Sequence, residues 1–385
     1  MELEDNLRIV NFDPEILREY DIRGIVDRNI TENIAYTIGR VFGYIVSSKL
    51  NSNEIVVGYD GRLTSPKLFK ALSIGLKHAG SNVANIGMCP TPMLYFGDYF
   101  LKSHAAIMIT GSHNPSEYNG FKMVLNKHSF FSKDIQNFNK IVSEIKLDKK
   151  NGNIKNFEIS DSYVKRILNN ITIDRKLKIA WDIGNGAMGT IIDKLVTKLK
   201  NTENILLNKE VDGNFPNHHP DPTVPENMQQ LIKSVKENNC DLGLAFDGDG
   251  DRLGVIDNLG NIVWADQYML VLCSEISKLY QNPKILMDVK CSKVFFDESK
   301  KMGCIPIMER TGHSIIKEKM KEIKSPLSGE MSGHVCYGDD FYGYDDAMYV
   351  ALRLIRILSK ENKPLSDLIE KFPKTFSTPE TRFDV

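Results

Sequence analysis

A short acidic loop offers the clearest chemistry in this sequence. The segment DGDGDR places three carboxylates, Asp247, Asp249 and Asp251, between glycines that leave room for a bound ion; we term it the aspartate loop. Converging carboxylates favour a hard divalent cation such as Mg2+, which is often shared with a phosphorylated ligand. A calcium EF-hand is excluded, because its sixth position would be Arg252 rather than Gly and its twelfth Asn258 rather than Glu. An acidic surface turn is the plainer alternative, but three adjacent acids repel one another without a cation.

A serine follows an apolar run in the first third of the chain. Ser112 lies in the segment Thr110–Pro115 (TGSHNP), which we term the serine loop, directly after residues 105–109. A hydroxyl on a glycine-containing loop can act as a nucleophile or carry a phosphoryl group, and His113 beside it can contact that phosphate. Gly-Ser and Asn-Pro are also ordinary turn sequences, so an inert turn is the alternative. No G-x-S-x-G sequence surrounds Ser112, so the nucleophile elbow of an α/β-hydrolase is not indicated.

Polar side chains alternate in a third segment, residues 329–334 (GEMSGH). On an extended backbone Glu330, Ser332 and His334 point to the same side and offer an acceptor, a hydroxyl and an imidazole. A polyhydroxyl ligand such as a sugar needs that combination, although a buried structural histidine is the commoner alternative. Four more residues have suitable chemistry but are, each alone, most often surface or capping residues: Arg23, Lys122, Lys290 and His313.

One motif points to a different function. Gly184–Gly189 (GNGAMG) matches G-x-G-x-x-G between a candidate strand and a candidate helix, and Glu210 follows about 20 residues later, as in nicotinamide-dependent dehydrogenases. A dehydrogenase leaves the aspartate and serine loops unexplained, and glycine-rich turns also pack closely in α/β domains that bind no nucleotide. We therefore expect no dinucleotide, and the absence of any fluorescence change on adding NAD(H) or NADP(H) would exclude one.

Composition and charge restrict the class of protein. The chain has 385 residues, enough for two to three domains, of which 42% are hydrophobic and 26% charged. Lysines and arginines number 49 against 50 acids, so there is no overall basic field for nucleic acid. The acidic start MELED lacks a signal-peptide pattern, and the most apolar window, residues 268–276, is too short to cross a bilayer. Six scattered cysteines fit free thiols in a reducing cytoplasm, where we expect the protein to work without a membrane partner.

Short β-branched runs alternate with helical stretches along the chain, which is typical of an α/β architecture. We expect strands at 54–59, 105–109, 121–125, 177–181, 241–246 and 284–289, and helices at 65–79, 190–199, 292–301 and 346–358. A polar stretch at 146–155 predicts the first domain boundary. The order predicts three successive related α/β domains around a shared cleft: residues 1–152 with the serine loop, 153–256 with the aspartate loop, and 257–371 with the segment 329–334.

Taken together, these segments resemble the α-D-phosphohexomutase family, and within it the phosphomannomutase/phosphoglucomutase branch. The resemblance covers nearly the whole chain through ordered motifs at 20–24, 110–115, 211–222 (VDGNFPNHHPDP), 247–252, 311–314 and 329–334. It implies mixed sheets covered by helices around the cleft. Met331 resembles the mannose/glucose branch, whereas the phosphoglucosamine mutase branch, which stays an alternative, tends to carry another residue there.

The resemblance implies a role for each candidate residue. The phosphoserine would be Ser112, which would bind Mg2+ together with Asp247, Asp249 and Asp251. The other catalytic residues, for phosphate contact and proton transfer, would be Arg23, Lys122, His113 and His334, and the substrate-binding residues would be Lys290, His313, Glu330, Ser332 and Arg252. The phosphoserine would phosphorylate a hexose 1- or 6-phosphate, and the resulting 1,6-bisphosphate would turn over in the cleft and return its other phosphate. A small sugar phosphate is then the expected partner, and we expect a monomer.

The end of the sequence departs from the family pattern. Members of the family have a fourth domain whose Arg-x-Ser-Gly-Thr loop clamps the non-transferred phosphate, and this sequence reaches Val385 without such a loop. Residues 372–385 resemble the start of that domain. We therefore expect a shortened form that is open on one side and weakly active, because the remote phosphate loses its anchor. A sugar-phosphate-binding protein without catalysis is the alternative, although the intact serine and aspartate loops argue against it.

Overall fold

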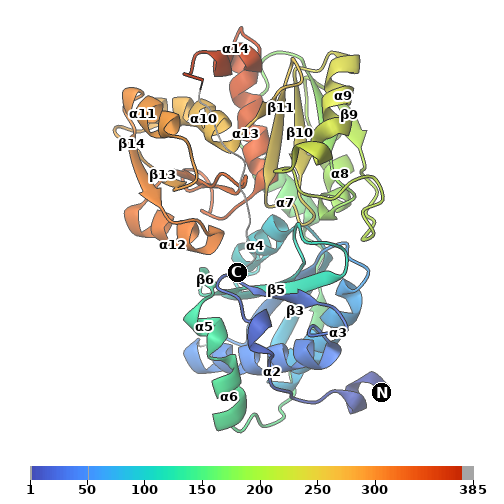
Figure 1. Cartoon of the computed structure of the whole chain (residues 1–385). Coiled ribbons are helices and arrows are strands. Elements are labelled where there is room, and N and C mark those ends of the chain that lie inside the picture. The colour runs from blue at the N-terminus through green and yellow to red at the C-terminus, as the bar shows by residue number, and fades with distance from the viewer. Residues whose placement is uncertain (1, 51, 375–385) are drawn as a thin grey trace.

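The computed structural model describes residues 2–50 and 52–374 and contains three α/β units, each built on its own sheet (Figure 1). The first sheet has seven strands in the order β1-β5-β4-β2-β3-β7, with β6 paired to β5. Its strands are β1 (Ile22–Ile25), β2 (Glu54–Tyr59), β3 (Asn82–Met88), β4 (Ala105–Ile109), β5 (Tyr118–Leu125), β6 (His128–Phe130) and β7 (Ile154–Asn156). β2 is parallel to β3 and β4, whereas β5 runs antiparallel to β1 and β4, so the sheet is mixed, as predicted.

Helices cover both faces of the first sheet. α2 (Glu32–Lys49) and α3 (Ser65–His78) pack on one face with Ile55 and Val57, whereas α4 (Thr91–Phe100) packs on the other face with Val56. This division follows from the two-residue period of a strand, which sends neighbouring side chains to opposite faces. The shorter helices of this unit are α1 (Glu2–Asn6), η1 (Pro14–Ile16), α5 (Lys133–Gln136) and α6 (Phe138–Glu144).

The second and third units each have parallel strands followed by antiparallel ones at one edge: two antiparallel pairings in the second sheet and one in the third. The second sheet has the order β12-β11-β10-β8-β9 and the third the order β14-β13-β15-β16. The second unit comprises α7 (Ser160–Ile167), β8 (Leu177–Asp182), η2 (Ala187–Thr190), α8 (Ile192–Val196), β9 (Thr202–Leu207), η3 (Pro225–Met228), α9 (Gln229–Asn238), β10 (Leu242–Phe246), β11 (Leu253–Asp257) and β12 (Ile262–Val263). The third comprises α10 (Ala265–Leu279), β13 (Lys284–Asp288), α11 (Lys293–Lys301), β14 (Ile305–Glu309), α12 (His313–Ile323), β15 (Leu327–Gly329), β16 (Val335–Tyr337), α13 (Ala347–Lys360) and α14 (Leu365–Glu370). The aspartate loop connects β10 to β11, and residues 330–334 connect β15 to β16.

The structure differs from the predicted elements at polar and irregular segments. The first sheet continues past the predicted boundary at residue 152, because β7 pairs with β3 through backbone hydrogen bonds that need no apolar side chain. The second sheet continues past residue 256, since β12 pairs with β11. The helix predicted at 190–199 is reduced to η2 and the short α8, because Ile191, with a φ of −126°, interrupts it. Residues 375–385, within the expected start of a fourth domain, lie outside the described part of the chain.

A continuous apolar cluster joins the three units. It includes Met93 and Phe96 on α4, Trp181 and Phe246 in the second sheet, and Tyr349 on α13. Figure 1 shows α4 and α7 next to each other where the first unit meets the other two. This packing brings the serine loop, the aspartate loop and residues 330–334 to one place. Among the described helices, none combines the length and the apolar character needed to span a membrane.

Candidate active site

The aspartate loop is a tight connection that folds back on its first residue. Asp247 Oδ1 accepts the backbone N–H groups of Gly250 and Asp251 at 3.0 Å and of Arg252 at 3.2 Å. Gly250 takes a left-handed φ of 76°, which the reversal requires and glycine adopts without strain. The side chains of Asp247, Asp249 and Asp251 are buried, and one carboxylate oxygen of each lies within 4.8 Å of the others.

The charge and the open lone pairs of these buried acids suit a metal ion. Burial and the neighbouring charges of Asp249 and Asp251 raise the pKa of Asp247 well above its ordinary value. Oδ1 of Asp249 and Oδ1 of Asp251 are buried and have no hydrogen-bond partner among the described residues. Converging carboxylate oxygens with unpartnered lone pairs are the ligands that a hard divalent cation prefers. The donor set therefore fits a metal site of the kind expected from the sequence.

Lys122 on β5 brings a positive charge to this cluster from the first sheet. Its Nζ lies 2.6 Å from Oδ2 of Asp249 and 2.6 Å from Oδ2 of Asp251. Burial opposes the charged form, but the two carboxylates hold the pKa of Lys122 well above its ordinary value. Thr91, at the start of α4, donates to Asp249 Oδ2 at 2.5 Å. The first and second units are therefore joined by charge and hydrogen bonds at the site itself.

The serine loop leaves the end of β4 and turns at Ser112. Ser112 has a left-handed φ of 50°, which costs a non-glycine residue about 1–2 kcal/mol and needs support from other contacts. Its N–H donates to Thr110 Oγ1 at 2.7 Å, and its buried Oγ donates to Asp247 Oδ2 at 3.0 Å. His113 Nδ1 lies 3.2 Å from the same Oγ, and burial together with Arg252 lowers the pKa of His113 well below its ordinary value. The hydroxyl thus faces the carboxylates with a neutral imidazole beside it.

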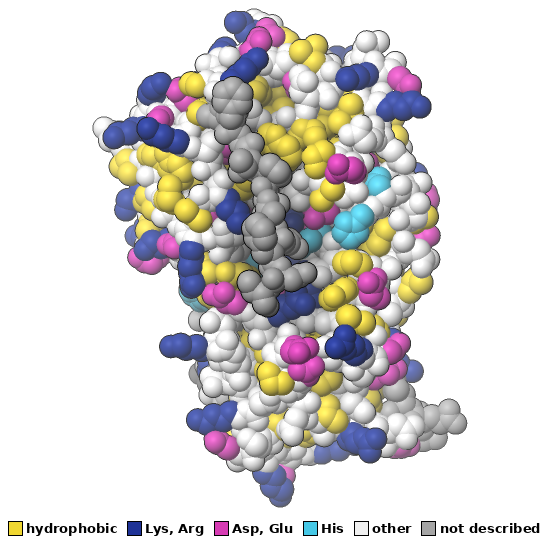
Figure 2. Space-filling model, in the orientation of Figure 1, with side chains coloured by type: hydrophobic (Ala, Val, Ile, Leu, Met, Phe, Trp, Pro, Cys, Tyr) yellow, Lys and Arg dark blue, Asp and Glu magenta, His cyan; other side chains and the backbone are white. Residues whose placement is uncertain are grey.

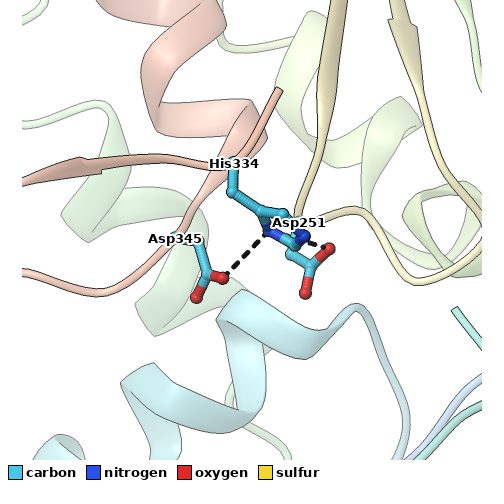
Figure 3. Close-up of side chains that lie close together, drawn as sticks. All are labelled: Asp251, His334 and Asp345. Atoms are coloured by element: carbon cyan, nitrogen blue, oxygen red, sulfur yellow. Dashed lines mark ion pairs between the residues drawn. The ribbon is translucent and has the colours of Figure 1, made fainter. Parts of the chain in front are cut away.

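The third unit contributes two stacked histidines. His313 begins α12 and His334 precedes β16, and their ring centroids lie 5.1 Å apart. His334 Nε2 accepts from Arg252 Nε at 3.0 Å, and its Nδ1 lies 3.0 Å from Asp345 Oδ2 and 3.5 Å from Asp251 Oδ1 (Figure 3). Because Nε2 is the acceptor, a neutral His334 carries its proton on Nδ1, between the two carboxylates.

Asp345 is a site residue that no sequence motif indicated. Besides His334, it pairs with Lys317 on α12 at 2.9 Å and lies 3.5 Å from His313 Nδ1. The buried carboxylate of Asp345 therefore contacts His313, Lys317 and His334 at once. The only sequence signal was a pair of acids, Asp345 and Asp346, before the last long helix, and that pattern is also typical of an ordinary helix cap.

A cavity of about 190 Å³ opens where the three units meet. Its lining includes seven of the predicted site residues: Arg23, Ser112, His113, Lys122, Arg252, His313 and His334. Arg18, Tyr20 and Asp21 also line it, and Asp21 forms an ion pair with Arg23. In Figure 2, histidine, basic and acidic side chains all appear around the level where the first unit meets the other two. The cavity is thus suited by charge to an anionic ligand.

Three predicted substrate-binding residues do not line this cavity. Glu330 is buried, and its Oε1 accepts the N–H of Gly312 at 2.5 Å, directly before His313. Ser332 is half-buried in the turn before β16, and Lys290 is exposed after β13. Their roles in binding a sugar stay predictions.

The glycine-rich turn Gly184–Gly189 packs against the aspartate loop. The N–H of Ala187 donates to Gly248 O at 2.9 Å, and a Cβ on Gly186 would lie 2.9 Å from the same oxygen. Backbone of the aspartate loop therefore fills the space next to Gly186, whereas a Cβ on Gly189 would lie 2.3 Å from Lys209 O and Gly184 takes a left-handed φ of 58°. Close packing and backbone conformation thus give these glycines a structural role.

Comparison with known proteins places this site in a family. The phosphoglucomutase/phosphomannomutase alpha/beta/alpha domains I, II and III match residues 14–151, 161–260 and 264–376. The chain is 44% identical over 372 residues to a phosphomannomutase/phosphoglucomutase of Pseudomonas syringae pv. tomato, covering 96% of this chain and 79% of that protein. It is 41% identical over 369 residues to a phosphoglucomutase of Neisseria gonorrhoeae, covering 95% and 79%. The crystal structure of a phosphoglucomutase/phosphomannomutase family protein from Burkholderia thailandensis matches with a TM-score of 0.91 at 39% identity, covering 96% of this chain and 81% of that one. The chain belongs to the phosphoglucomutase/phosphomannomutase family.

Proposed function

We propose that this protein interconverts the 1-phosphate and 6-phosphate of a hexose, mannose or glucose, through a phosphorylated Ser112 and a hexose 1,6-bisphosphate. The observation that carries the proposal is the position of Ser112 Oγ, which is hydrogen-bonded to the carboxylate cluster and lines a cavity rich in basic side chains. A hydroxyl in that position can pass a phosphoryl group to a ligand held by those basic groups. The names of the relatives, phosphomannomutase/phosphoglucomutase and phosphoglucomutase, support the choice of hexoses.

A metal ion is part of the proposed phosphoserine state. Asp247, Asp249 and Asp251, with an oxygen of the phosphorylated Ser112, would hold Mg2+, whose charge offsets the negative charge on the phosphoryl oxygens in the transition state. Ser112 Oγ lies only 3.0 Å from an oxygen of Asp247. A phosphate attached there without a cation would repel the three carboxylates, so the chain's own residues favour phosphorylation only with a metal present.

Each half-reaction moves one phosphoryl group between Ser112 and a sugar hydroxyl. In the first half-reaction the bond from phosphorus to Ser112 Oγ breaks and a bond from phosphorus to the oxygen on carbon 1 or 6 forms, while the sugar hydroxyl gives up its proton and Ser112 Oγ takes one up; the second half-reaction runs the same steps in reverse with the other phosphate. Lys122 and His334 line the same cavity and are the candidates for accepting and returning that proton. Lys122 is an ammonium beside its two aspartates and acts as the donor in this arrangement. His334 Nε2 can accept a proton once Arg252 turns from it to a phosphate.

The lining of the cavity supports binding of the phosphate that is not transferred. Arg23, Arg252 and His313 supply cationic or hydrogen-bonding groups there, and Arg23 Nη1 also donates to Asn114 in the serine loop at 2.5 Å. The bisphosphate must be held in two orientations, so both of its ends need such groups. We propose that Glu330, Ser332 and Lys290 contact the sugar hydroxyls, and substitution of each residue tests this.

Turnover by the purified chain tests this proposal. Mannose 1-phosphate, glucose 1-phosphate and glucosamine 1-phosphate are supplied in parallel with Mg2+ and a trace of the matching 1,6-bisphosphate, and formation of the 6-phosphate is measured. Ser112→Ala should abolish turnover, whereas Ser116→Ala, which changes an exposed serine four positions on, should leave it unchanged. Full turnover by Ser112→Ala would refute the phosphoserine. Binding of hexose phosphate by the wild type, without isotope exchange between 1- and 6-phosphate, would indicate a binding protein instead.

A further inference from the structure

Arg62 is a buried arginine that holds the serine loop by its backbone. It lies in the turn after β2 and is 1% exposed. Its Nη2 donates to the carbonyl oxygens of Ser112 at 2.7 Å and Asn114 at 2.6 Å, and its Nη1 to those of Pro115 at 2.6 Å and Tyr118 at 3.1 Å. One planar guanidinium therefore fixes the chain from Ser112 to the start of β5, which the single nitrogen of a lysine cannot do in the same geometry.

Asp60 also fixes the serine loop, through contacts to Arg62 and to the start of the loop. Its Oδ2 lies 3.2 Å from Arg62 Nε and accepts from Thr110 Oγ1 at 2.8 Å and from the N–H of Gly111 at 3.2 Å. A Cβ on Gly111 would lie 2.4 Å from Arg62 Nε, so glycine allows the guanidinium to lie against the loop. Ser112, with its unfavourable left-handed φ, is thus fixed on both sides by one buried ion pair.

A loop of the second unit packs against Arg62. Phe215, within the motif 211–222, has its ring centroid 5.2 Å from Arg62 Cζ, a cation–π distance. A Cβ on Gly213 in the same motif would lie 2.7 Å from Arg62 Cα, and a Cβ on Gly61 would lie 2.2 Å from Val211. The proposed function gives this motif no role, and its contacts place it on the turn that carries Arg62.

We propose that Arg62 is a positioning residue for phosphoryl transfer and that Phe215 keeps it in place; this inference rests on the proposed role of Ser112. Arg62 does not line the cavity, so it acts through the serine loop. In-line transfer requires Ser112 Oγ in a precise position, and Arg62 fixes the carbonyl group of Ser112 itself. Without these hydrogen bonds the backbone of Ser112 relaxes toward the right-handed or extended regions, which turns Oγ away from Asp247. Arg252 and His313, which line the cavity from the other two units, do not contact Arg62 and stay in place.

Substitution of Arg62 should therefore lower kcat and leave KM nearly unchanged. A reacting group misplaced by about 1 Å loses about 100-fold in rate, so we expect about that loss in Arg62→Ala, with KM for the hexose 1-phosphate changed less than about threefold.

Guanidinium chloride at millimolar concentration should restore part of the kcat of Arg62→Ala in a saturable manner, and NaCl at the same concentration should not. Arg62→Lys should behave like Arg62→Ala but without this rescue, and Phe215→Leu should lower kcat about threefold to tenfold. Arg28→Lys, at an exposed arginine of the same unit, is the matched control and should keep its kcat.

The outcomes separate this inference from the proposed function. If the wild type shows no turnover that depends on Ser112, the proposed function fails, and the inference fails with it. If the wild type turns over, but a folded Arg62 variant keeps its kcat or loses only in KM, the positioning role is overturned while the function stands. If circular dichroism shows that Arg62→Ala is not folded, Arg62→Lys and Phe215→Leu test the positioning role in its place. An unchanged kcat in both of these variants overturns the inference.

Discussion

The buried carboxyl group of Asp346 should make this protein less stable as the pH rises, and Asp346→Asn should remove that loss. Asp346 caps α13: its Oδ1 accepts the N–H of Tyr349 at 2.9 Å, and the hydroxyl of Tyr163 lies 3.0 and 2.9 Å from its two oxygens. The side chain is 1% exposed and follows another buried acid, Asp345. Burial, opposed in part by these hydrogen bonds, raises the pKa of Asp346 to about 7. Asparagine keeps the shape and an acceptor oxygen and is an equally good cap, so the substitution removes mainly the charge.

The size and sign of this pH effect on stability follow from the pKa of Asp346 in the unfolded chain, 3.8, and in the folded chain, about 7. Below the ordinary value of 3.8 the carboxyl group is protonated in both the folded and the unfolded chain, so its pKa shift does not change the free energy of unfolding with pH there. Between 3.8 and about 7 only the unfolded chain has lost the proton, so the free energy of unfolding falls as the pH rises. Above about 7 both states are ionised and the loss is complete. An interval of about 3 pH units corresponds to about 4 kcal/mol, which Asp346→Asn should recover at pH 8.

Urea unfolding at several pH values measures this difference. Trp181, buried in β8, supplies a fluorescence signal. The stability gain of Asp346→Asn over the wild type should grow by about 2.5 kcal/mol between pH 5 and pH 8. This is less than the full effect of about 4 kcal/mol, because part of the interval between the two pKa values of Asp346 lies below pH 5. Asp367→Asn, at an exposed acid in the first turn of α14, is the control and should give no such trend. A gain for Asp346→Asn that is absent, or equal at pH 5 and pH 8, would refute the argument that an ionised carboxylate is costly at this position.

Two further predictions concern the charges around the site. Mg2+ at one hundred times its dissociation constant should raise the free energy of unfolding by about 2.7 kcal/mol, seen as a shift in thermal unfolding. Asp249→Asn should reduce that shift, and no shift in the wild type would contradict the metal site. Tyr163→Phe removes a donor to Asp346 and should cost about 1–3 kcal/mol in urea unfolding at pH 8, where the carboxylate is ionised, and less at pH 5.5. An equal cost at both pH values would contradict a role of this hydroxyl in stabilising the charge.

The chemistry of the site is predictable from the sequence where one short segment carries it. Asp247, Asp249 and Asp251 are two residues apart in a loop between buried strands, so local backbone geometry is enough to bring their carboxylates together. Ser112 lies three residues after the end of a short buried strand, and the loop turns at that residue. The strands at 54–59 and 105–109 have their predicted bounds, because a continuous apolar run ended by polar turn residues leaves little choice of register.

Contacts between distant segments are not predictable in this way. Arg62 bonds to the serine loop 50 residues later, and Lys122 bonds to Asp251 129 residues later, so no local pattern marks either pair. Lys290 and Ser332 show the same limit, because their residue types suit a binding site but no local pattern tells that they lie outside the lining of the cavity; their roles stay predictions. Residue type indicates which chemistry a side chain can do, but the packing of whole units decides whether it reaches the site.

The residues of the site are also the contacts that align the three units. Lys122 of the first unit pairs with Asp249 and Asp251 of the second, and Arg252 of the second donates to His334 of the third at 3.0 Å. Removing one partner of a buried ion pair such as Lys122–Asp251 costs about 3–5 kcal/mol, because the other charge stays buried without a partner. The arrangement that satisfies the buried charges is therefore the one that completes the site. A phosphate bound in the cavity as proposed would compete with the carboxylates and the imidazole for Lys122 and Arg252, so ligand binding and the alignment of the units would depend on the same few hydrogen bonds.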